Sequence, residues 1–119
     1  MNRHFRLTPP PISEDDVEAG CKDILNLHHY WVVRLHAGTF KSWDGLRPIR
    51  GVSKGTPDYA CLHGRHRNFL LEVKRPGGKL SDDQKIQIAV LVDQFELPVV
   101  VVESVEELCN FLAKHEHPP

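Results

Sequence analysis

Three polar residues lie close enough along the chain to act together: Asp58, Glu72 and Lys74. Glu72 and Lys74 flank Val73 in an apolar run, and because side chains alternate along a strand, both face the same side of the predicted sheet. Thirteen residues separate Asp58 from Glu72, enough for one strand, a turn and most of a second strand. If the strands form a hairpin, Asp58 at the start of the first lies opposite Glu72 near the end of the second. The spacing therefore predicts two converging carboxylates beside a lysine.

These residue types suit Mg²⁺, which keeps several waters and is commonly held by one or two carboxylates together with substrate phosphate oxygens. Such an ion polarises a phosphoryl group and makes a water molecule a stronger nucleophile near neutral pH. Lys74 would position that water or stabilise the charge that develops on the phosphate. The reaction indicated is hydrolysis of a phosphodiester. Taken singly, an exposed ion pair and a turn would explain the same residues. The order of Asp58, Glu72, Lys74 and a downstream Gln84, beside a basic loop, favours the site.

The elements that must hold these residues follow from capping signals and hydrophobic periodicity. Each predicted helix starts at a serine followed three residues later by an acid or glutamine, which is a capping box. Residues 37–56 are expected to form a long loop, with room for a short β element. The predicted helices begin at Ser13, Ser81 and Ser104 and have the apolar stripes Val17–Cys21–Ile24–Leu25–His28, Ile88–Leu91–Val92–Phe95 and Val105–Leu108–Cys109–Leu112. The predicted strands are residues 30–35, 58–62, 68–74 and 99–102, the last expected to be buried on both faces.

The predicted order is αβββαβα, an α/β fold with a central mixed sheet and helices on its faces, because a strand reached through a crossover helix lies parallel to its partner. The chain of 119 residues fits one domain. We expect that domain to span residues 13–117, after an extended arm over residues 1–12 that contains Pro9–Pro11.

Composition excludes several classes of protein. The chain is 40% apolar and 26% charged, which fits neither a disordered nor a fibrous chain. The longest apolar run, Ile88–Val92, is far shorter than the ~20 residues needed to span a bilayer. The first residues have no apolar core of signal-peptide length, so a cytoplasmic protein is expected. Three cysteines without a CxxC pair argue against a disulfide framework or structural zinc, and no organic cofactor is expected.

The net charge of −1 conceals a strong segregation of charge. Residues 34–79 contain ten Lys and Arg against three acids, a balance of +7, whereas the remainder contains five basic and thirteen acidic residues, a balance of −8. A basic cluster of this kind is the footprint of phosphate contacts with a nucleic acid. The candidate DNA-binding residues are Arg34, Arg50, Lys54, Arg75 and Lys79.

Two stretches together resemble a known family. Residues 51–58 (GVSKGTPD) and 69–84 (FLLEVKRPGGKLSDDQ) are similar to the VRR-NUC domain of the PD-(D/E)xK nuclease superfamily. The similarity extends over about residues 13–102, and the chain resembles the minimal stand-alone members found in bacteriophages and bacteria. The resemblance implies a restriction-endonuclease-like core of order αβββαβ, in agreement with the order predicted above.

The resemblance also implies roles for individual residues. Asp58, Glu72 and the backbone carbonyl of Val73 would bind the metal, Lys74 would be the catalytic lysine, and Gln84 would be the glutamine that follows the motif on the next helix. A glutamate on the first helix often completes such sites. Counting back from Arg34, by analogy with archaeal junction resolvases, places it at Glu18, but Glu14 lies one turn earlier on the same face and remains an alternative. Glu14 or Glu18 could also simply favour the helix N-terminus.

The function implied is a Mg²⁺- or Mn²⁺-dependent, structure-selective DNA endonuclease that acts on branched DNA such as four-way (Holliday) junctions. The alternatives are a flap or nicking nuclease, a catalytically inactive module that binds branched DNA, and a metal-free regulatory or assembly protein. Stand-alone relatives of this kind imply a homodimer, for which Tyr30, Trp31 and Phe40 supply apolar residues that we expect to be exposed.

Overall fold

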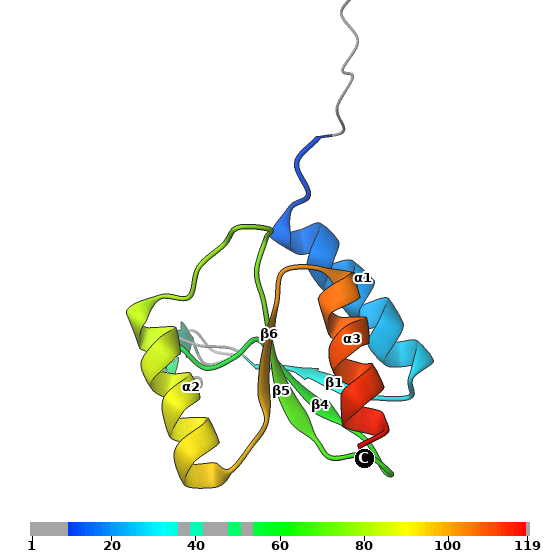
Figure 1. Ribbon diagram of the computed structural model, residues 1–119. Coiled ribbons are helices and arrows are strands. Elements are labelled where there is room, and N and C mark those ends of the chain that lie inside the picture. The colour runs from blue at the N-terminus through cyan, green and yellow to red at the C-terminus, as the bar shows by residue number, and fades with distance from the viewer. Residues whose placement is uncertain (1–9, 36–38, 42–47, 51–53, 119) are drawn as a thin grey trace, which may run out of the picture.

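The computed structural model describes residues 10–35, 39–41, 48–50 and 54–118, with side chains outside the two three-residue segments. The described chain folds as an α/β structure with a mixed sheet, which confirms the predicted fold class (Figure 1). The elements are α1 (Glu14–Leu27), β1 (Trp31–Arg34), β2 (Thr39–Lys41), β3 (Pro48–Arg50), β4 (Tyr59–Leu62), β5 (Phe69–Val73), α2 (Asp82–Phe95), β6 (Val99–Val102) and α3 (Val105–Glu116). No helix in these ranges is long and apolar enough to cross a bilayer.

The helices begin where their serines predict. The Ser13 side chain accepts from the Asp16 N–H and the Asp16 side chain accepts from the Ser13 N–H, so the capping box of α1 is complete. The capping box of α2, made by Ser81 and Gln84, is also complete. In α3 only half of the predicted box forms. The Ser104 side chain accepts from the Glu107 N–H, but the Glu107 carboxylate accepts from the N–H of Glu103 rather than from that of Ser104.

The main sheet has the strand order β1-β4-β5-β6. Strands β4 and β5 form the predicted antiparallel hairpin, with Tyr59 opposite Leu71 and Cys61 opposite Phe69. Strand β1 pairs antiparallel with β4, whereas β6 pairs parallel with β5 after the α2 crossover. This parallel pairing confirms the expected mixed sheet.

One face of the sheet carries the hydrophobic core. Helices α1 and α3 pack side by side on this face (Figure 1). Their buried residues Val17, Cys21, Leu25, Leu108 and Leu112 meet Phe69, Leu71 and Val73 of β5. The ring of Phe69 lies 4.9 Å from that of Phe111 and 5.4 Å from that of Tyr30. Tyr30 is therefore a core residue and only 4% exposed, which corrects the expectation of a surface role, whereas Trp31 is 71% exposed as expected.

The other face is covered only by α2, and incompletely. None of the residues of α2 is buried, although its apolar stripe predicts a core-facing helix. The prediction that β6 is buried on both faces is wrong: it is the last strand of the sheet, only Val102 is buried, and Val101 is 36% exposed. A strand at a sheet edge lacks one neighbour, so an apolar sequence alone does not secure its burial.

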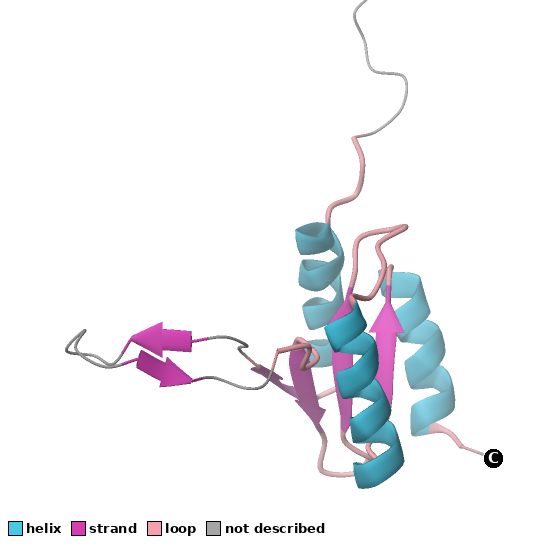
Figure 2. Cartoon of the chain, turned by 90° about the vertical axis from the view of Figure 1, so that its left-hand side faces the viewer, coloured by secondary structure: helices cyan, strands magenta, loops and turns pink. Residues whose placement is uncertain are grey.

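The predicted long loop after β1 contains the β element that its sequence allowed. Strands β2 and β3 pair antiparallel as a separate two-stranded sheet, with Phe40 opposite Ile49. Figure 2 shows this ribbon projecting from the body of the molecule. Residues 1–9 of the predicted arm lie outside the described residues, as does the side chain of Phe40.

Candidate active site

The two predicted carboxylates meet at one end of the β4–β5 hairpin. Asp58 immediately precedes β4, and Glu72 is the fourth residue of β5. Since Tyr59 lies opposite Leu71, the antiparallel register brings Asp58 opposite Glu72. The Asp58 carboxylate accepts a hydrogen bond of 3.0 Å from the N–H of Val73, and its carbonyl accepts one of 2.8 Å from the N–H of Leu35. Asp58 is thus fixed between β1 and β5.

Glu72 is an acidic side chain inside the protein. It is 2% exposed, the one polar residue among the described buried residues. Burial raises its pKa to about 7, the negative charge of Asp58 adds to this rise, and Lys74 opposes it. Oε2 lies 3.5 Å from the Lys74 ammonium, whereas Oε1 is buried and has no hydrogen-bond partner in the described part of the chain. Burying a carboxylate oxygen without a partner is costly, so a cation is the natural complement of this group.

Gln84 joins the site to the start of α2. Its side-chain oxygen accepts from the Ser81 N–H to complete the capping box. Its side-chain nitrogen donates a hydrogen bond of 3.2 Å to Glu72 Oε2. Gln84 can make the capping contact and the contact with Glu72 together, because one amide group has both an acceptor and donors.

The structure separates the two candidate glutamates of α1. Glu18 is held by the Arg34 guanidinium at 2.5 Å and by the buried hydroxyl of Tyr59, and Arg34 also donates to that hydroxyl at 2.7 Å. Partial burial raises the pKa of Glu18, but the hydrogen bonds from Tyr59 and Arg34 outweigh it and leave the pKa below its usual value. Glu14, by contrast, acts on Glu72 through its charge and contributes to the raised pKa there.

The sequence analysis did not predict a role for Tyr59. Its hydroxyl bonds to Glu18 of α1 and so joins α1 to β4, the strand that begins beside Asp58. The available signal was a tyrosine directly after the acid. Neighbouring side chains of a strand point to opposite faces, so Tyr59 points to the face covered by α1 while Asp58 remains in the site.

The donor set fits a hard divalent cation. Asp58 and Glu72 supply two carboxylates, one of them with a buried, unpartnered oxygen. The C=O of a strand residue points to the same side as its N–H. The Val73 carbonyl is therefore directed toward Asp58, to which its N–H donates. The described residues include no group of three or more His, Cys, Asp or Glu side chains placed to hold a metal ion. Two carboxylates, a carbonyl and waters match the ligation that Mg²⁺ prefers and would not suit zinc.

The segment before Asp58 packs against the start of α2. Gly55 has a φ of +89°, and a Cβ there would lie 2.4 Å from the carbonyl oxygen of Asp83. Lys54 forms an exposed ion pair of 3.2 Å with Asp83. Glycine is required at residue 55 by both the backbone conformation and the close approach.

The predicted DNA-binding residues have different surroundings. Lys54, Arg75 and Lys79 are exposed. Arg34 is half exposed and paired with Glu18, and the side chain of Arg50 lies outside the described residues. Lys54, Arg75 and Lys79 belong to the loops that adjoin Asp58 and Glu72, so this end of the sheet combines two carboxylates with a basic rim.

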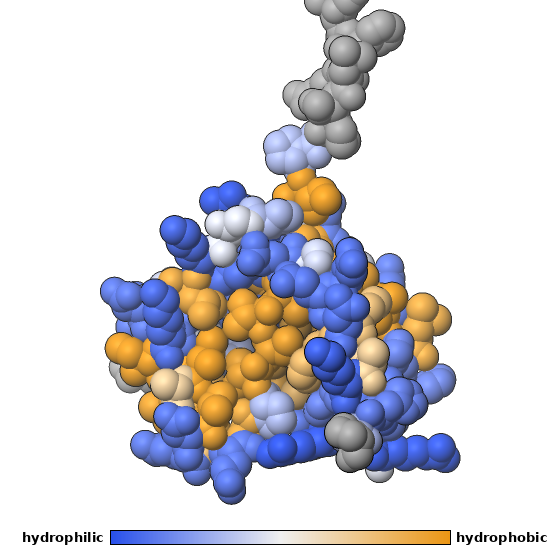
Figure 3. All heavy atoms as spheres, viewed as in Figure 1, coloured by the Kyte–Doolittle hydropathy of each residue, from blue (hydrophilic) through white to orange (hydrophobic). Residues whose placement is uncertain are grey.

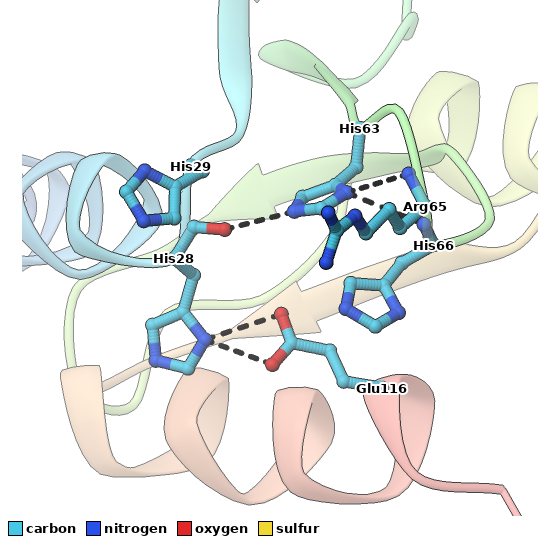
Figure 4. A pocket seen from close by; sticks show the side chains of 6 residues that line it. All are labelled: His28, His29, His63, Arg65, His66 and Glu116. Carbon is cyan, nitrogen blue, oxygen red and sulfur yellow. Dashed lines mark hydrogen bonds and ion pairs between the residues drawn. The ribbon is translucent and has the colours of Figure 1, made fainter.

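A separate pocket lies at the opposite, turn end of the β4–β5 hairpin (Figure 4). Its volume is about 590 Å³, and it is lined by His28, His29, His63, Arg65, His66 and Glu116. The His63 Nε2 bonds the carbonyl of His28 at 3.0 Å, and its Nδ1 accepts from the N–H groups of Arg65 and His66. Both ring nitrogens of His63 are thus used to hold the turn against the end of α1.

A comparison with protein families agrees with this site. The VRR-NUC domain matches residues 14–106, well over half of the chain. No curated protein matches the chain. The matched region begins at the first residue of α1 and includes the whole sheet, α2 and every predicted metal ligand. The chain therefore belongs to the VRR-NUC family, whose domain implies a nuclease of the PD-(D/E)xK type.

Proposed function

We propose that the protein is a Mg²⁺- or Mn²⁺-dependent, structure-selective DNA endonuclease that hydrolyses phosphodiester bonds in branched DNA. The observation that carries the proposal is the buried Glu72 carboxylate, whose Oε1 has no partner among the described residues, facing Asp58 and Lys74. Without a cation, the buried Oε1 has no partner among the described residues and costs folding free energy. The retention of all three groups in one cluster therefore supports catalysis.

In this proposal Asp58, Glu72 and the Val73 carbonyl hold the ion. When bound, the ion supplies Lewis-acid polarisation of the phosphodiester and makes a water molecule a stronger nucleophile near neutral pH. Lys74, half-buried beside Glu72, orients the attacking water and offsets negative charge that develops on the phosphate. Gln84 donates to Glu72 Oε2 and so directs the carboxylate.

We assign the helix position of the site to Glu14. Its charge reaches Glu72, whereas the Glu18 carboxylate is already shared by Arg34 and Tyr59. Glu14 lies in the exposed first turn of α1, where it is free to approach an ion through a water.

The basic rim would hold the DNA backbone. Lys54, Arg75 and Lys79 are exposed beside the carboxylates, and Arg34 and Arg50 extend the same positive segment. Contacts of this type release counterions, so binding is expected to weaken steeply with added salt. A homodimer would present two such sites, one for each strand of a four-way junction.

A substrate panel tests the proposal. Labelled four-way, flap, nicked and linear duplex DNA would be incubated with the wild type and with Lys74→Ala, with Mg²⁺, with Mn²⁺ and with a chelator. We expect cutting of branched DNA by the wild type with metal only. Lys74→Ala should cut at least about 100-fold more slowly, because it removes an electrostatic contact made in the transition state. Lys114→Ala, in the last turn of α3, is the matched control and should cut normally.

The outcomes separate the alternatives. Salt-sensitive binding of branched DNA without cutting under any metal condition would identify the inactive binding module. Preferential cutting of flap or nicked DNA would show that these structures, rather than four-way junctions, are the preferred substrates. Absence of salt-sensitive DNA binding would overturn the proposal and favour a regulatory or assembly role.

A further inference from the structure

The pocket at the turn end of the β4–β5 hairpin has no part in the proposed cleavage chemistry. Its walls come from three separate elements: the end of α1, the hairpin turn and the end of α3 (Figure 4). Strand β5 is five residues long, so the pocket lies on the order of 15 Å from Glu72. Its volume of about 590 Å³ is typical of small-molecule sites. Hydrophilic residues cover this end of the molecule, at the bottom of Figure 3, whereas apolar residues gather between α2 and α3.

Glu116 supplies an oriented hydrogen-bond acceptor in this pocket. The His28 Nδ1 lies 2.9 Å from Oε1 and 3.1 Å from Oε2, which fixes the position of the carboxylate. Burial raises the pKa of Glu116, but His28 and Tyr30 outweigh it and leave the net pKa below its usual value. The group is therefore ionised near neutral pH and can only accept hydrogen bonds. Because an ionised carboxylate has about four lone-pair positions, it can accept from a ligand as well as from His28.

The facing wall supplies unpaired donors and a flat ring. Figure 4 shows the side chains of Arg65 and His66 extending from the hairpin turn toward Glu116. The Arg65 guanidinium forms no hydrogen bond or ion pair with any other described residue. The half-buried His66 ring packs against the ring of His63, with the centroids 4.5 Å apart. Both ring nitrogens of His63 are bonded within the structure, so the donors open to a ligand on this wall belong to Arg65 and His66.

The rim of the pocket includes a strained residue. His29 follows the C-cap of α1, and its φ of +67° lies in the left-handed region that favours glycine. A glycine would end the helix equally well, so stability does not explain an imidazole at this residue. Strained residues cluster at binding sites, and this strain therefore supports a ligand in the pocket.

The charges argue against two common kinds of ligand. A phosphate would face the Glu116 carboxylate and the C-terminal ends of α1 and α3, where the helix dipoles present partial negative charge. A metal ion would face the Arg65 guanidinium, and the described residues include no group of three or more His, Cys, Asp or Glu side chains placed to hold one. A neutral, planar ligand with both donors and acceptors suits the carboxylate, the guanidinium and the imidazole together.

We propose that this pocket binds an unpaired guanine base of the DNA substrate. Guanine presents two adjacent donors, N1–H and N2–H, to the Glu116 carboxylate, and its acceptors O6 and N7 to the Arg65 guanidinium. Its ring stacks on the His66 imidazole. None of the other three bases presents both pairs of groups. The base must be unpaired, because Watson–Crick pairing occupies N1–H, N2–H and O6.

The inference rests on DNA being the substrate of the proposed function, and it adds a means of choosing where that DNA is cut. The separation of about 15 Å from the carboxylates corresponds to roughly four or five stacked nucleotides at 3.4 Å each. An unpaired guanine held in the pocket would therefore fix which phosphodiester of the same strand reaches Asp58 and Glu72. The pocket contributes to substrate selection and not to the reaction step.

Binding of single-stranded DNA by the full chain, with a chelator and no added metal, tests the inference. The probes are short labelled oligothymidines that carry one central guanine, adenine or cytosine, so that the backbone charge is the same in all. By fluorescence anisotropy we expect the guanine probe to bind at least about 5-fold more tightly than the others, the lower limit for one bidentate base contact. Pairing the guanine in a duplex should abolish this preference.

Variants identify the residues that read the base. Arg65→Ala and His66→Ala should each remove most of the guanine preference. Arg67→Ala is the matched control: it removes the same charge from the same turn, but Arg67 does not line the pocket, so the preference should persist. Thermal melting verifies that all three variants fold.

Analogues of guanine test the individual contacts. A 7-deazaguanine probe lacks N7 and should bind more weakly than guanine to the wild type but equally to Arg65→Ala. An inosine probe lacks the N2 amino group that donates to Glu116 and should lose part of the preference in the wild type. Equal binding of guanine, inosine and 7-deazaguanine by the wild type would contradict the proposed contacts.

Equal affinity for all the oligothymidine probes would overturn the inference, and so would a guanine preference that survives both Arg65→Ala and His66→Ala. Guanosine monophosphate is a further probe, because a free nucleotide carries the same base. If it bound through Arg65 while the DNA probes showed no preference, the ligand would be a free nucleotide and not DNA. Since no measurement involves cleavage, failure of this inference and failure of the nuclease proposal remain distinguishable.

Discussion

At Glu72, two requirements of the protein oppose each other. The fold places this carboxylate in the buried strand β5, where its pKa rises to about 7, mainly through burial and then through Asp58. The proposed function requires the same group to be ionised so that it can bind a cation. Lys74 and Gln84 stabilise the negative charge of the carboxylate through their contacts with Oε2. Oε1 has no partner among the described residues. The residue therefore links stability, pH and metal binding.

The metal-free protein should lose stability as the pH rises from about 4.5 to 7. The ordinary pKa of a glutamate is 4.5, whereas that of Glu72 in the folded protein is about 7. Ionisation above pH 4.5 therefore favours the unfolded chain, by on the order of 3 kcal/mol once complete. Glu72→Gln cannot ionise, so at pH 8 without metal it should melt several degrees above the wild type. Mg²⁺ should raise the melting temperature of the wild type only. An identical pH dependence in both proteins would contradict this account.

The two glutamates of α1 should respond differently to substitution. Glu18→Gln weakens the hydrogen bonds with Arg34 and Tyr59 and should lower the free energy of unfolding by about 1–2 kcal/mol. Cleavage of DNA by this variant should continue. Glu14→Gln should leave the unfolding free energy within about 1 kcal/mol, the usual value of a helix-dipole charge, but reduce metal-dependent cutting about 10-fold or more. Urea titration and single-turnover cleavage measure the two quantities. The reverse pattern would assign the site to Glu18.

At the scale of elements, the site depends on how the segment before β4 meets the start of α2. Gly55 touches the backbone of Asp83 and Gln84, and Lys54 pairs with Asp83. This contact, together with the Ser81 capping box, holds the first turn of α2 against the hairpin. The position of Gln84 beside Glu72 is therefore set by the backbone of two separate segments.

Gly55→Ala should disturb this junction. An L-residue at a φ of +89° is strained, and its Cβ would lie 2.4 Å from the Asp83 carbonyl oxygen, so we expect a loss of about 2 kcal/mol and slower cutting. Gly64→Ala is the control, since a Cβ at Gly64 meets nothing within 4 Å and its φ is not positive. Thermal melting of both variants decides the matter; equal melting temperatures would show that the close approach is unimportant.

At the scale of the whole molecule, the two ends of the sheet carry different groups of side chains. One end carries the carboxylates and the basic rim. At the other, the His28 Nδ1 and the Glu116 carboxylate, 88 residues apart in sequence, lie 2.9 Å apart and tie the end of α1 to the end of α3. His63 secures the hairpin turn to the same place. These contacts hold α1, α3 and the hairpin turn together at this end of the sheet.

The contact between His28 and Glu116 should make the stability of the fold sensitive to acid. Burial raises the pKa of Glu116, but His28 and Tyr30 outweigh it, and the net pKa is lowered. A lowered pKa contributes stability above about pH 4.5, which is lost as the pH falls through the folded value. Glu116→Gln should therefore be less stable than the wild type at pH 7 and lose less on acidification. Urea titrations between pH 7 and 3 measure this, with Glu106→Gln, in the exposed first turn of α3, as the control that should follow the wild type.

Patterns in the sequence were enough to predict the elements and the proximity of Asp58 to Glu72. Serine caps, the alternation in Phe69–Lys74 and the turn between β4 and β5 act over a few residues, so helix starts, the hairpin and the meeting of Asp58 with Glu72 could be predicted. The contacts of Glu18 with Arg34 and Tyr59, the burial of Tyr30 and the exposure of α2 and β6 came only from the tertiary structure. These outcomes depend on which distant segments pack together and which strand ends the sheet. Local periodicity identifies an apolar face but does not specify what covers it.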